Sequence, residues 1–520
     1  MRGLLVSLLC LSLSSFGWGA DLEVPGQYPT IQAALDAAVD GDRVLVSAGT
    51  YAERLATNLS IELIGVDGPE LTILDARGAP GSGSALALQY HSGGAALVRG
   101  FTIHGDQATI FAFPFGGGAI TSFGGYLTVE QCIIEDCDLR NTAGPSGGGI
   151  LANAMMAVVL RDSIFRNNHC IGQGGAVYAA SSEVVISGCL FEDNSSDLNS
   201  GAIYTHFPLI TDCIFRNNSS GDDAGAVSIA GSGRIQNSIF ERNSANGQGG
   251  ALFVSDDLDV FQCVFYDNSS AGTGGAIRHF SHSMHIESSL ILNNSAPSRG
   301  AVSTQTGFSS SNSIYWQNGP SPLWNTSLNN IQYCIVEGGF PGVGNFDADP
   351  LISDPVNSDY SLLYGSPATD AGSNVLLRRD LDDLNGNGLI SDGYGHDMLG
   401  NPRHTQDLFV ADTGELDMLT FPLDIGPIER IIPTPTDGYD DCNGNSINDL
   451  LDIMSETETD LNENLIPDSC DIADGTLTDA DGDGVPDEYQ NACVPDLNED
   501  GELDFFDVSL FLQLFSMGCP

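Results

Sequence analysis

A repeat of about 25 residues constrains the fold of this chain more than any other feature. Each repeat carries an aliphatic residue, a Phe five positions later, an Asn three positions after that, and then a Gly-Ala pair followed by a branched residue. The aromatic column comprises Phe165, Phe191, Phe215, Phe240 and Phe265 with Ile291 in the next repeat, and the asparagine column comprises Asn168, Asn194, Asn218, Asn243, Asn268 and Asn294. Columns kept in register over six repeats indicate a solenoid.

The composition of each repeat indicates which solenoid this is. Short β-branched runs are broken by Gly, Asn and Ser, and none of them has helical spacing. Parallel strands stacked about 4.8 Å apart place each residue above its equivalent in the previous coil. Phe would then pack on Phe, and Asn side chains would bond along the stack. We therefore predict an all-β fold, a right-handed parallel β-helix of some 11 or 12 coils over residues 21–345.

Two sets of motifs resemble known families. The pairs Phe-x-x-Asn and Gly-Gly-Ala-[Ile/Leu/Val] resemble the repeats of polymorphic outer membrane proteins, and residues 28–35, 41–46 and 49–51 resemble the start of pectin-lyase-type β-helices. The second resemblance implies a short helix over the first coil, where Ile31, Ala34, Leu35 and Ala38 would share one face. These resemblances imply the fold, which lyases, hydrolases, epimerases and adhesins share.

The sequence outside the repeats indicates four further segments. Arg2, the apolar run from Leu4 to Leu13 and the small residues up to Ala20 are typical of a signal peptide over residues 1–20. We expect the last coils and a C-terminal cap at 346–430, a proline-stiffened linker at 431–437 and an acidic module at 438–520. No later apolar stretch has the length of a membrane span. The expected location is secreted, extracellular or at the cell surface.

The charge balance limits the classes of binding partner that the chain can have. The chain has 17 basic residues, all of them Arg, against 69 acidic residues, and its formal net charge is −52. Nucleic-acid affinity depends on basic residues that neutralise phosphates, so this composition argues against nucleic acid. It argues equally against anionic membrane surfaces and favours cations, above all Ca²⁺.

The acidic residues of the tail follow a metal-ligand spacing. Four loops place Asp or Asn at positions 1, 3, 5 and 9, and Ca²⁺ takes six to eight such oxygen ligands. A disordered acidic tail is the alternative interpretation. The candidate ligands are Asp441, Asn443, Asn445, Asp449 and Asp452; Asp460, Asn462, Asn464, Asp468 and Asp471; Asp479, Asp481, Asp483 and Asp487; and Asp496, Asn498, Asp500, Asp504 and Asp507.

The tail also resembles known modules. Its fourth loop with Val508 to Phe515 resembles one half of a type I dockerin, and the earlier loops resemble thrombospondin type 3 repeats. The resemblance implies retention at a surface or binding to a cohesin-like protein, although only one dockerin half is complete. Four cysteines predict two disulfides in the tail, and three pairings are open: Cys442, Cys470, Cys493 and Cys519. The cysteines of the repeat alternate with Ser, which favours a packing role.

Two functions remain open from the sequence. Arg166, Glu192, Arg216 and Glu241 follow the Phe column, and we interpret them as an exposed ion-pair ladder in place of a catalytic pair. A second cluster comprises Arg278, His279, His282, Asp257 and Asp259. It offers an Arg or His base beside acidic residues, as in a polysaccharide lyase. The alternative is that these residues form a polar loop without catalytic function. We favour a secreted binding or structural protein whose ligand is a polysaccharide or a surface protein. The alternative is a polysaccharide lyase or glycoside hydrolase.

Overall fold

The computed structural model describes most of the repeat region and parts of the tail. It covers residues 19–81, 83–89, 93–105, 118–139, 147–180, 183–319, 322–324, 329–363, 365–377, 397–399, 423–429, 442, 453, 458–461, 466–480 and 484–487. The chain divides into two compact units, Met1–Ile431 and Ile432–Pro520.

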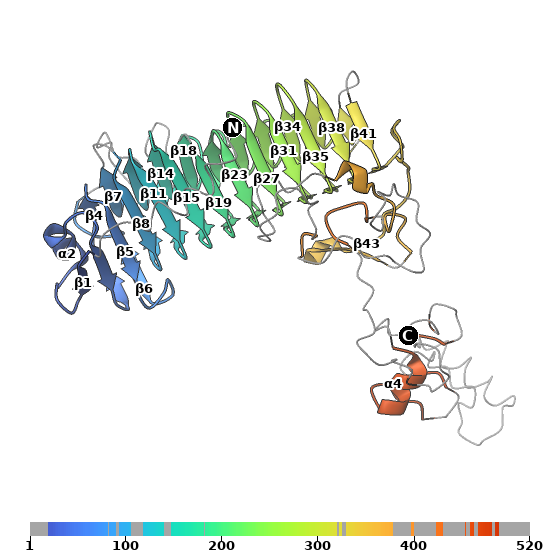
Figure 1. Cartoon of the computed structure of the whole chain (residues 1–520), viewed down its shortest axis with the longest axis horizontal. Helices are drawn as coiled ribbons and strands as arrows, with labels where there is room; N and C mark the ends of the chain where they lie inside the picture. Colours follow the sequence, from blue (N-terminus) through green and yellow to red (C-terminus); the bar gives the residue numbers. More distant parts are fainter. Residues whose placement is uncertain are drawn as a thin grey trace, which may run out of the picture. The chain divides into compact units, whose positions relative to one another are not determined.

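The first unit is a right-handed parallel β-helix (Figure 1). The strands of its coils form four sheets, and each full coil contributes a strand to sheets 1, 2, 3 and 4 in turn. Sheet 1 has 13 strands: β1 (Asp21–Val24), β2 (Arg43–Val46), β5 (Ile61–Gly65), β8 (Ala95–Arg99), β11 (Tyr126–Glu130), β15 (Ala157–Arg161), β19 (Val184–Ser187), β23 (Pro208–Thr211), β27 (Gly233–Gln236), β31 (Leu258–Phe261), β35 (Met284–Glu287), β38 (Phe308–Ser311) and β41 (Asn329–Gln332).

Sheets 2 and 3 follow in the coil. Sheet 2 has 12 strands: β3 (Gly49–Tyr51), β6 (Thr72–Asp75), β9 (Thr102–His104), β12 (Ile133–Glu135), β16 (Ile164–Arg166), β20 (Leu190–Glu192), β24 (Ile214–Arg216), β28 (Ile239–Glu241), β32 (Val264–Tyr266), β36 (Leu290–Leu292), β39 (Ile314–Trp316) and β42 (Ile335–Val336). Sheet 3 has six two-residue strands: β13 (Asp138–Leu139), β17 (His169–Cys170), β21 (Ser195–Ser196), β25 (Ser219–Ser220), β29 (Ser244–Ala245) and β33 (Ser269–Ser270).

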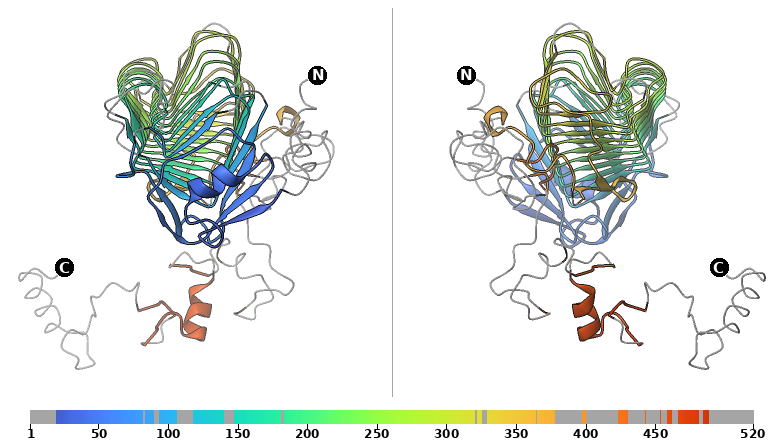
Figure 2. Two further views of the ribbon diagram at one scale, coloured as in Figure 1. Left: turned by 90° about the vertical axis from the view of Figure 1, so that its left-hand side faces the viewer. Right: turned by 90° about the vertical axis from the view of Figure 1, so that its right-hand side faces the viewer.

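Sheet 4 completes each coil and has 11 strands: β4 (Leu55–Thr57), β7 (Leu86–Gln89), β10 (Ile120–Phe123), β14 (Ile150–Asn153), β18 (Val177–Ala180), β22 (Ile203–Thr205), β26 (Val227–Ile229), β30 (Leu252–Val254), β34 (Ile277–His279), β37 (Val302–Thr304) and β40 (Leu323–Trp324). Viewed end on, the strands of successive coils superpose (Figure 2). This superposition places every repeat position in a straight column, as the sequence predicts.

The core contains the predicted aromatic column. Phe165, Phe191, Phe215, Phe240 and Phe265 pair in register along sheet 2 and are fully buried. Their rings stack nearly parallel, with centroids 4.7–4.9 Å apart. Aromatic pairs left to themselves prefer offset or edge-to-face geometry. The parallel stack is therefore imposed by the spacing of the strands.

The asparagine column forms a buried hydrogen-bonded ladder. In Asn218, the backbone N and Nδ2 both donate to Oδ1 of Asn243 in the next coil, at 3.0 Å each. Nδ2 of Asn243 also donates to the backbone oxygen of Phe215 at 2.9 Å. The left-handed turn falls one residue before this column, with φ of 53–55° at positions that mostly carry Asn or Asp: Asn167, Asp193, Asn217, Arg242 and Asp267.

A short helix covers the first coil, as predicted. Helix α2 (Ile31–Ala37) lies across the end of the solenoid in the left view of Figure 2. The hydroxyl of Thr30 accepts a hydrogen bond from the backbone N of Ala33 and caps the helix. Ile31, Ala34 and Leu35 are buried in the same cluster as the core of the coils. The helix therefore closes an otherwise open end of the solenoid.

The segment after the last coil folds back on the solenoid. It contains β43 (Ile352–Asp354), the 3₁₀ helix η2 (Pro355–Asn357), β44 (Asp359–Leu362) and η3 (Asn374–Leu376). β43 and β44 pair antiparallel and join none of the four sheets. We expected further coils beyond residue 345, but the described residues of this segment pack on the outer face of sheet 2. Tyr360 and Leu362 contact a cluster there that includes Tyr266 and Leu292.

The second unit contains α4 (Asp468–Asp474). A disulfide joins Cys442 to Cys470, one of the pairings that the sequence left open. Cys493 and Cys519 lie outside the described residues. Among the described residues, no helix has the length and apolar character needed to cross a membrane.

We expect Asn243→Ala to destabilise the solenoid strongly. The substitution removes two bonds that Asn243 donates and leaves the buried N and Nδ2 of Asn218 without their acceptor. An orphaned buried polar group costs about 1–3 kcal/mol, so the total loss should be on the order of 4 kcal/mol. Guanidinium denaturation followed by circular dichroism measures it.

Asn246→Ala is the matched control, because this side chain is exposed in the following loop. It should change stability by less than about 0.5 kcal/mol. Equal unfolding midpoints for the two variants would contradict a structural role of the ladder.

Candidate functional site

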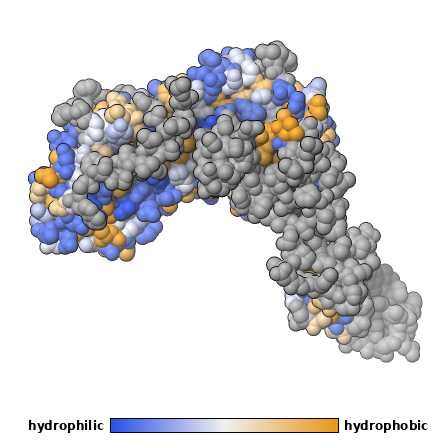
Figure 3. Space-filling model, viewed as in Figure 1, coloured by the Kyte–Doolittle hydropathy of each residue, from blue (hydrophilic) through white to orange (hydrophobic). Residues whose placement is uncertain are grey.

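The outer face of sheet 2 carries one continuous column of ionisable side chains. The last residue of each strand from β6 to β28 lies in register with the next. We call this column the outer ladder: Asp75, His104, Glu135, Arg166, Glu192, Arg216 and Glu241. Beyond β28 the same position becomes apolar, and the segment after the last coil covers it. Figure 3 shows another face of the molecule, in the view of Figure 1, where hydrophilic and hydrophobic residues are mixed over the coils.

Opposite charges alternate along much of the outer ladder. Arg216 lies 3.6 Å from Glu192 and 3.0 Å from Glu241. Arg166 pairs with Glu135 of the preceding coil, with 2.5 Å between Nε and Oε2, and this hydrogen bond raises the pKa of Arg166. Glu135 was not part of the column predicted from the sequence, which began at Arg166. The pair of Arg216 with Glu192 is partly exposed on both sides and contributes little to stability, because water screens it.

The covered end of the ladder is different. Glu241 is only 1% exposed, whereas the sequence predicted an exposed position. The hydroxyls of Ser358 and Tyr360 each donate to its Oε2 at 3.0 Å. Burial, with the adjacent Glu241 charge, raises the pKa of Tyr360 well above its usual value. Glu241 therefore anchors the segment after the last coil to sheet 2.

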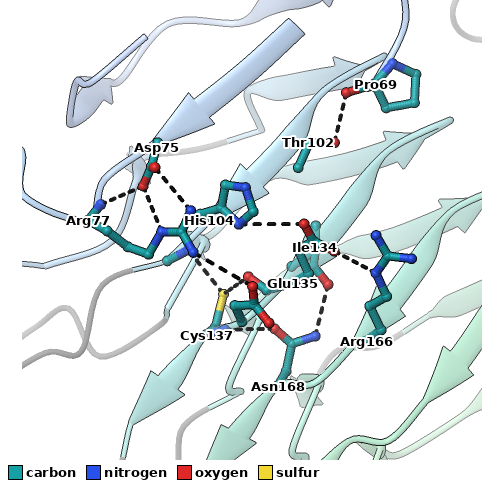
Figure 4. Close-up of polar contacts among 12 residues, drawn as sticks. Pro69, Asp75, Arg77, Thr102, His104, Ile134, Glu135, Cys137, Arg166 and Asn168 are labelled. Carbon is teal, nitrogen blue, oxygen red and sulfur yellow. Dashed lines mark hydrogen bonds and ion pairs between the residues drawn. The ribbon is translucent and has the colours of Figure 1, made fainter. Parts of the chain in front are cut away.

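The open end of the ladder gathers a compact polar cluster (Figure 4). Arg77 holds Asp75 through two side-chain contacts of 3.0 and 3.1 Å. Burial acts to raise the pKa of Asp75, but the hydrogen bonds and charge of Arg77 outweigh it and lower the pKa. Arg77 also lies 3.6 Å from Asp136, and Nδ1 of His104 lies 3.6 Å from Oε1 of Glu135. Two arginines, Arg77 and Arg166, thus meet three carboxylates and one imidazole across four successive coils.

The outer face of sheet 4 carries aromatic side chains. Tyr178 and Tyr204 are in register and half-buried, and their rings stack with centroids 5.1 Å apart. Further along, Phe253 and Phe280 lie 5.2 Å apart. We call this surface the aromatic face, and it comprises Tyr178, Tyr204, His206, Phe207, Phe253 and Phe280. The sequence did not predict this face, because the outward position is aromatic in β18, β22 and β30 but carries Ser228 in β26.

The candidate catalytic residues do not converge on one groove. Arg278 is 2% exposed on sheet 4, where its Nε donates to Gln248 Oε1 at 3.0 Å and its guanidinium lies over Phe280. Burial lowers the pKa of Arg278. The next residue, His279, is fully buried and bonded to Thr304 and to the backbone oxygen of Asp256.

The other members of that cluster lie elsewhere. His282 pairs with Asp256 at 2.7 Å in the exposed turn after β34. Asp257 accepts a hydrogen bond from the backbone N of Ser283. Asp259 lies on sheet 1, 4.0 Å from Arg234. The five candidates therefore occupy separate sheets and a turn, an arrangement that does not form a concerted acid–base site.

The cysteines of the β-helix that the structure describes are buried thiols without disulfides. Burial raises the pKa of Cys132 and of Cys263 to about 12. A buried thiol that stays protonated is a poor nucleophile. This environment agrees with a packing role.

Five of the candidate calcium ligands lie in the described residues: Asp460, Asp468, Asp471, Asp479 and Asp487. Asp468 and Asp487 hold equivalent positions 19 residues apart and make equivalent bonds. Their carboxylates accept from the backbone N of Leu461 and of Ala480, at 2.9 and 3.0 Å. The remaining candidates lie outside the described residues: Asp441, Asn443, Asn445, Asp449, Asp452, Asn462, Asn464, Asp481, Asp483, Asp496, Asn498, Asp500, Asp504 and Asp507.

Comparisons with known proteins agree with the coil architecture. The profile of the right-handed β-helix region matches residues 85–260, and that of the Chlamydia polymorphic membrane protein repeat matches residues 262–278. A search of curated proteins found no match. Among solved structures, the PL6 family alginate lyase AlyGC is similar at 14% identity and a TM-score of 0.36, over 63% of this chain and 49% of that chain. The chain thus spans about half the length of that protein.

We expect Tyr360→Phe to loosen the segment after the last coil. The variant loses a buried hydrogen bond to the charged Glu241, and such bonds contribute about 1.5–3 kcal/mol. Limited proteolysis should cleave between residues 346 and 377 sooner than in the wild type. Tyr51→Phe is the control, because it removes a hydroxyl that bonds to Ser47 at an exposed site. Equal cleavage rates for both variants would argue against Glu241 as the anchor.

Proposed function

We propose that this chain is an extracellular, non-catalytic β-helix protein that binds a neutral polysaccharide through the aromatic face and is retained at a surface by a calcium-binding tail. The observation that carries the proposal is the two pairs of aromatic side chains on the outer face of sheet 4, Tyr178 with Tyr204 and Phe253 with Phe280. The C–H faces of sugar rings pack on aromatic rings, which offer apolar area with little loss of conformational entropy. Coils rise about 4.8 Å each, a spacing close to the length of one sugar unit in an extended glycan.

The charge of the chain favours a neutral ligand. With 69 acidic residues against 17 basic ones, its field repels uronic-acid polymers. Arg278, which lies in register with Phe253 beside the aromatic face, is buried under Phe280 and offers little charge to a polymer. An uncharged glycan avoids this electrostatic cost.

The calcium proposal for the tail rests on donor chemistry. Asp468 is fully buried, and its Oδ2 has no hydrogen-bond partner among the described residues. A buried carboxylate oxygen without a donor is costly unless a cation faces it. Aspartate and asparagine oxygens are the ligands that Ca²⁺ prefers. Asp460, Asp468 and Asp471 would hold one ion, and Asp479 and Asp487 would contribute to the next.

Several features support an extracellular location. The N-terminal 20 residues have the composition of a signal peptide. The Cys442–Cys470 disulfide suits an oxidising compartment. The similarity of residues 262–278 to a polymorphic membrane protein repeat is in line with a surface protein.

We expect the double variant Tyr178→Ala/Tyr204→Ala to lose affinity for the glycan. Two stacking contacts contribute about 1–3 kcal/mol, so the Kd should rise about thirtyfold. Binding of the full chain to neutral polysaccharides (cellulose, xylan and mannan) and to acidic ones (alginate and pectate) is measured by pull-down.

Tyr126→Ala serves as the control, since Tyr126 is equally half-exposed but lies on sheet 1. Equal binding by the wild type and the double variant would remove the aromatic face as the site. Preference for alginate or pectate would overturn the neutral ligand, and release of shortened products would assign an enzyme.

We expect the full chain to bind several Ca²⁺ ions, and Asp468→Asn and Asp487→Asn to lose one site each. Each substitution removes one negative charge from one loop, which weakens Ca²⁺ coordination. Isothermal calorimetry gives the stoichiometry. Asp347→Asn removes the same charge at an exposed position of the first unit and should change nothing. Absence of heat at millimolar Ca²⁺ would remove the calcium proposal.

A further inference from the structure

We propose that His104, Glu135 and Asp136 form a binding site for a divalent transition-metal ion, with Zn²⁺ as the reference cation. The site lies at the open end of the outer ladder on sheet 2, whereas the aromatic face lies on sheet 4. It is independent of the glycan and calcium proposals.

Three potential ligands converge from two coils. His104 ends β9, Glu135 ends β12, and the two are in register on the outer face of sheet 2. Asp136 follows in the left-handed conformation, with φ of 56°. One ligand atom from each residue lies within 4.8 Å of the other two.

The imidazole supplies the observation that points to a ligand. His104 is only 9% exposed, and its Nδ1 has no hydrogen-bond partner among the described residues. Its nearest acceptor, Oε1 of Glu135, lies at 3.6 Å, which is too long for a hydrogen bond. Two ligands of a tetrahedral ion with bonds of 2.0–2.1 Å stand about 3.4 Å apart. The observed separation therefore suits two neighbouring ligands of one metal ion.

Neighbouring arginines hold the carboxylates in place. Arg166 bonds to Oε2 of Glu135 and leaves Oε1 facing the imidazole. Arg77 lies 3.6 Å from Oδ2 of Asp136 and is itself held by Asp75. Such outer contacts orient metal ligands and commonly tune affinity by 10- to 100-fold. They also balance the two negative charges when no cation is bound, so folding need not depend on the metal.

The donor set selects the class of metal. A neutral imidazole with two carboxylates suits Zn²⁺ and related ions, whereas Ca²⁺ and Mg²⁺ prefer oxygen ligands alone. Three protein ligands leave at least one coordination position for water or for a ligand oxygen. The expected calcium loops of the tail have no imidazole in the ligand frame, so excess Ca²⁺ can occupy them without displacing Zn²⁺ from His104.

The test compares Zn²⁺ binding by the full chain in saturating Ca²⁺. We expect the wild type to bind one more equivalent of Zn²⁺ than His104→Gln, Glu135→Gln or Asp136→Asn, or to bind it at least tenfold more tightly. Calorimetry measures the stoichiometry, and the absorption spectrum of bound Co²⁺ should lose intensity in the His104→Gln variant. Circular dichroism checks that each variant is folded, and Asn suits the left-handed backbone at position 136.

His282→Gln is the matched control, because it removes an imidazole that pairs with a single carboxylate, Asp256. It should bind Zn²⁺ as the wild type does. Identical binding by the wild type and by all folded site variants would overturn the proposal and leave His104 and Glu135 as an ion pair. A wild type that binds no Zn²⁺ in the presence of Ca²⁺ would overturn it as well.

Discussion

Hydrogen bonding between successive coils at a constant pitch is the constraint on which the rest of this structure depends. Parallel strands lie about 4.8 Å apart, so every side chain meets its equivalent from the neighbouring coil. The Phe rings are stacked at 4.7–4.9 Å because the backbone holds them there. The asparagine ladder also satisfies buried backbone groups in the turn between sheets 2 and 3. The Phe stack in the core and the Asn ladder in the turn thus both stabilise the same spacing between successive coils.

The same stacking creates columns of side chains on the outer surface, where core packing does not restrict the residue type. Sheet 2 carries the charged outer ladder over its first coils and an apolar surface over its last ones. Sheet 4 carries aromatic side chains in the equivalent outward position. One solenoid can therefore present a polar cluster, an anchored terminal segment and an apolar face without any change in its core.

Inward columns could be predicted from the sequence because burial repeats them in every coil. The Phe and Asn columns and the buried cysteines are of this kind. The outer ladder could be predicted only in part. Arg166 and Glu192 are 26 positions apart, but His104 and Glu135 are 31 apart (135 − 104), so the regular spacing does not align them. Arg166 consequently pairs with Glu135, which the regular repeat spacing did not identify.

The candidate catalytic cluster was predicted from residues that are close in sequence, but the alternation of side chains along a strand separates them. Arg278 and His279 are adjacent in β34 of sheet 4, yet successive residues of a strand point to opposite faces, so Arg278 lies on the outer face and His279 points inward. Asp259 belongs to another sheet altogether.

The amino-acid sequence by itself determined the solenoid, its pitch, the inward columns and the acidic character of the tail, because these depend on repeated local patterns and composition. Only the tertiary structure decided which outward side chains meet, that Glu241 is buried under Tyr360, and that an imidazole and two carboxylates share one end of sheet 2. Coil length varies from turn to turn, and contacts between coils depend on the register that the folded backbone adopts.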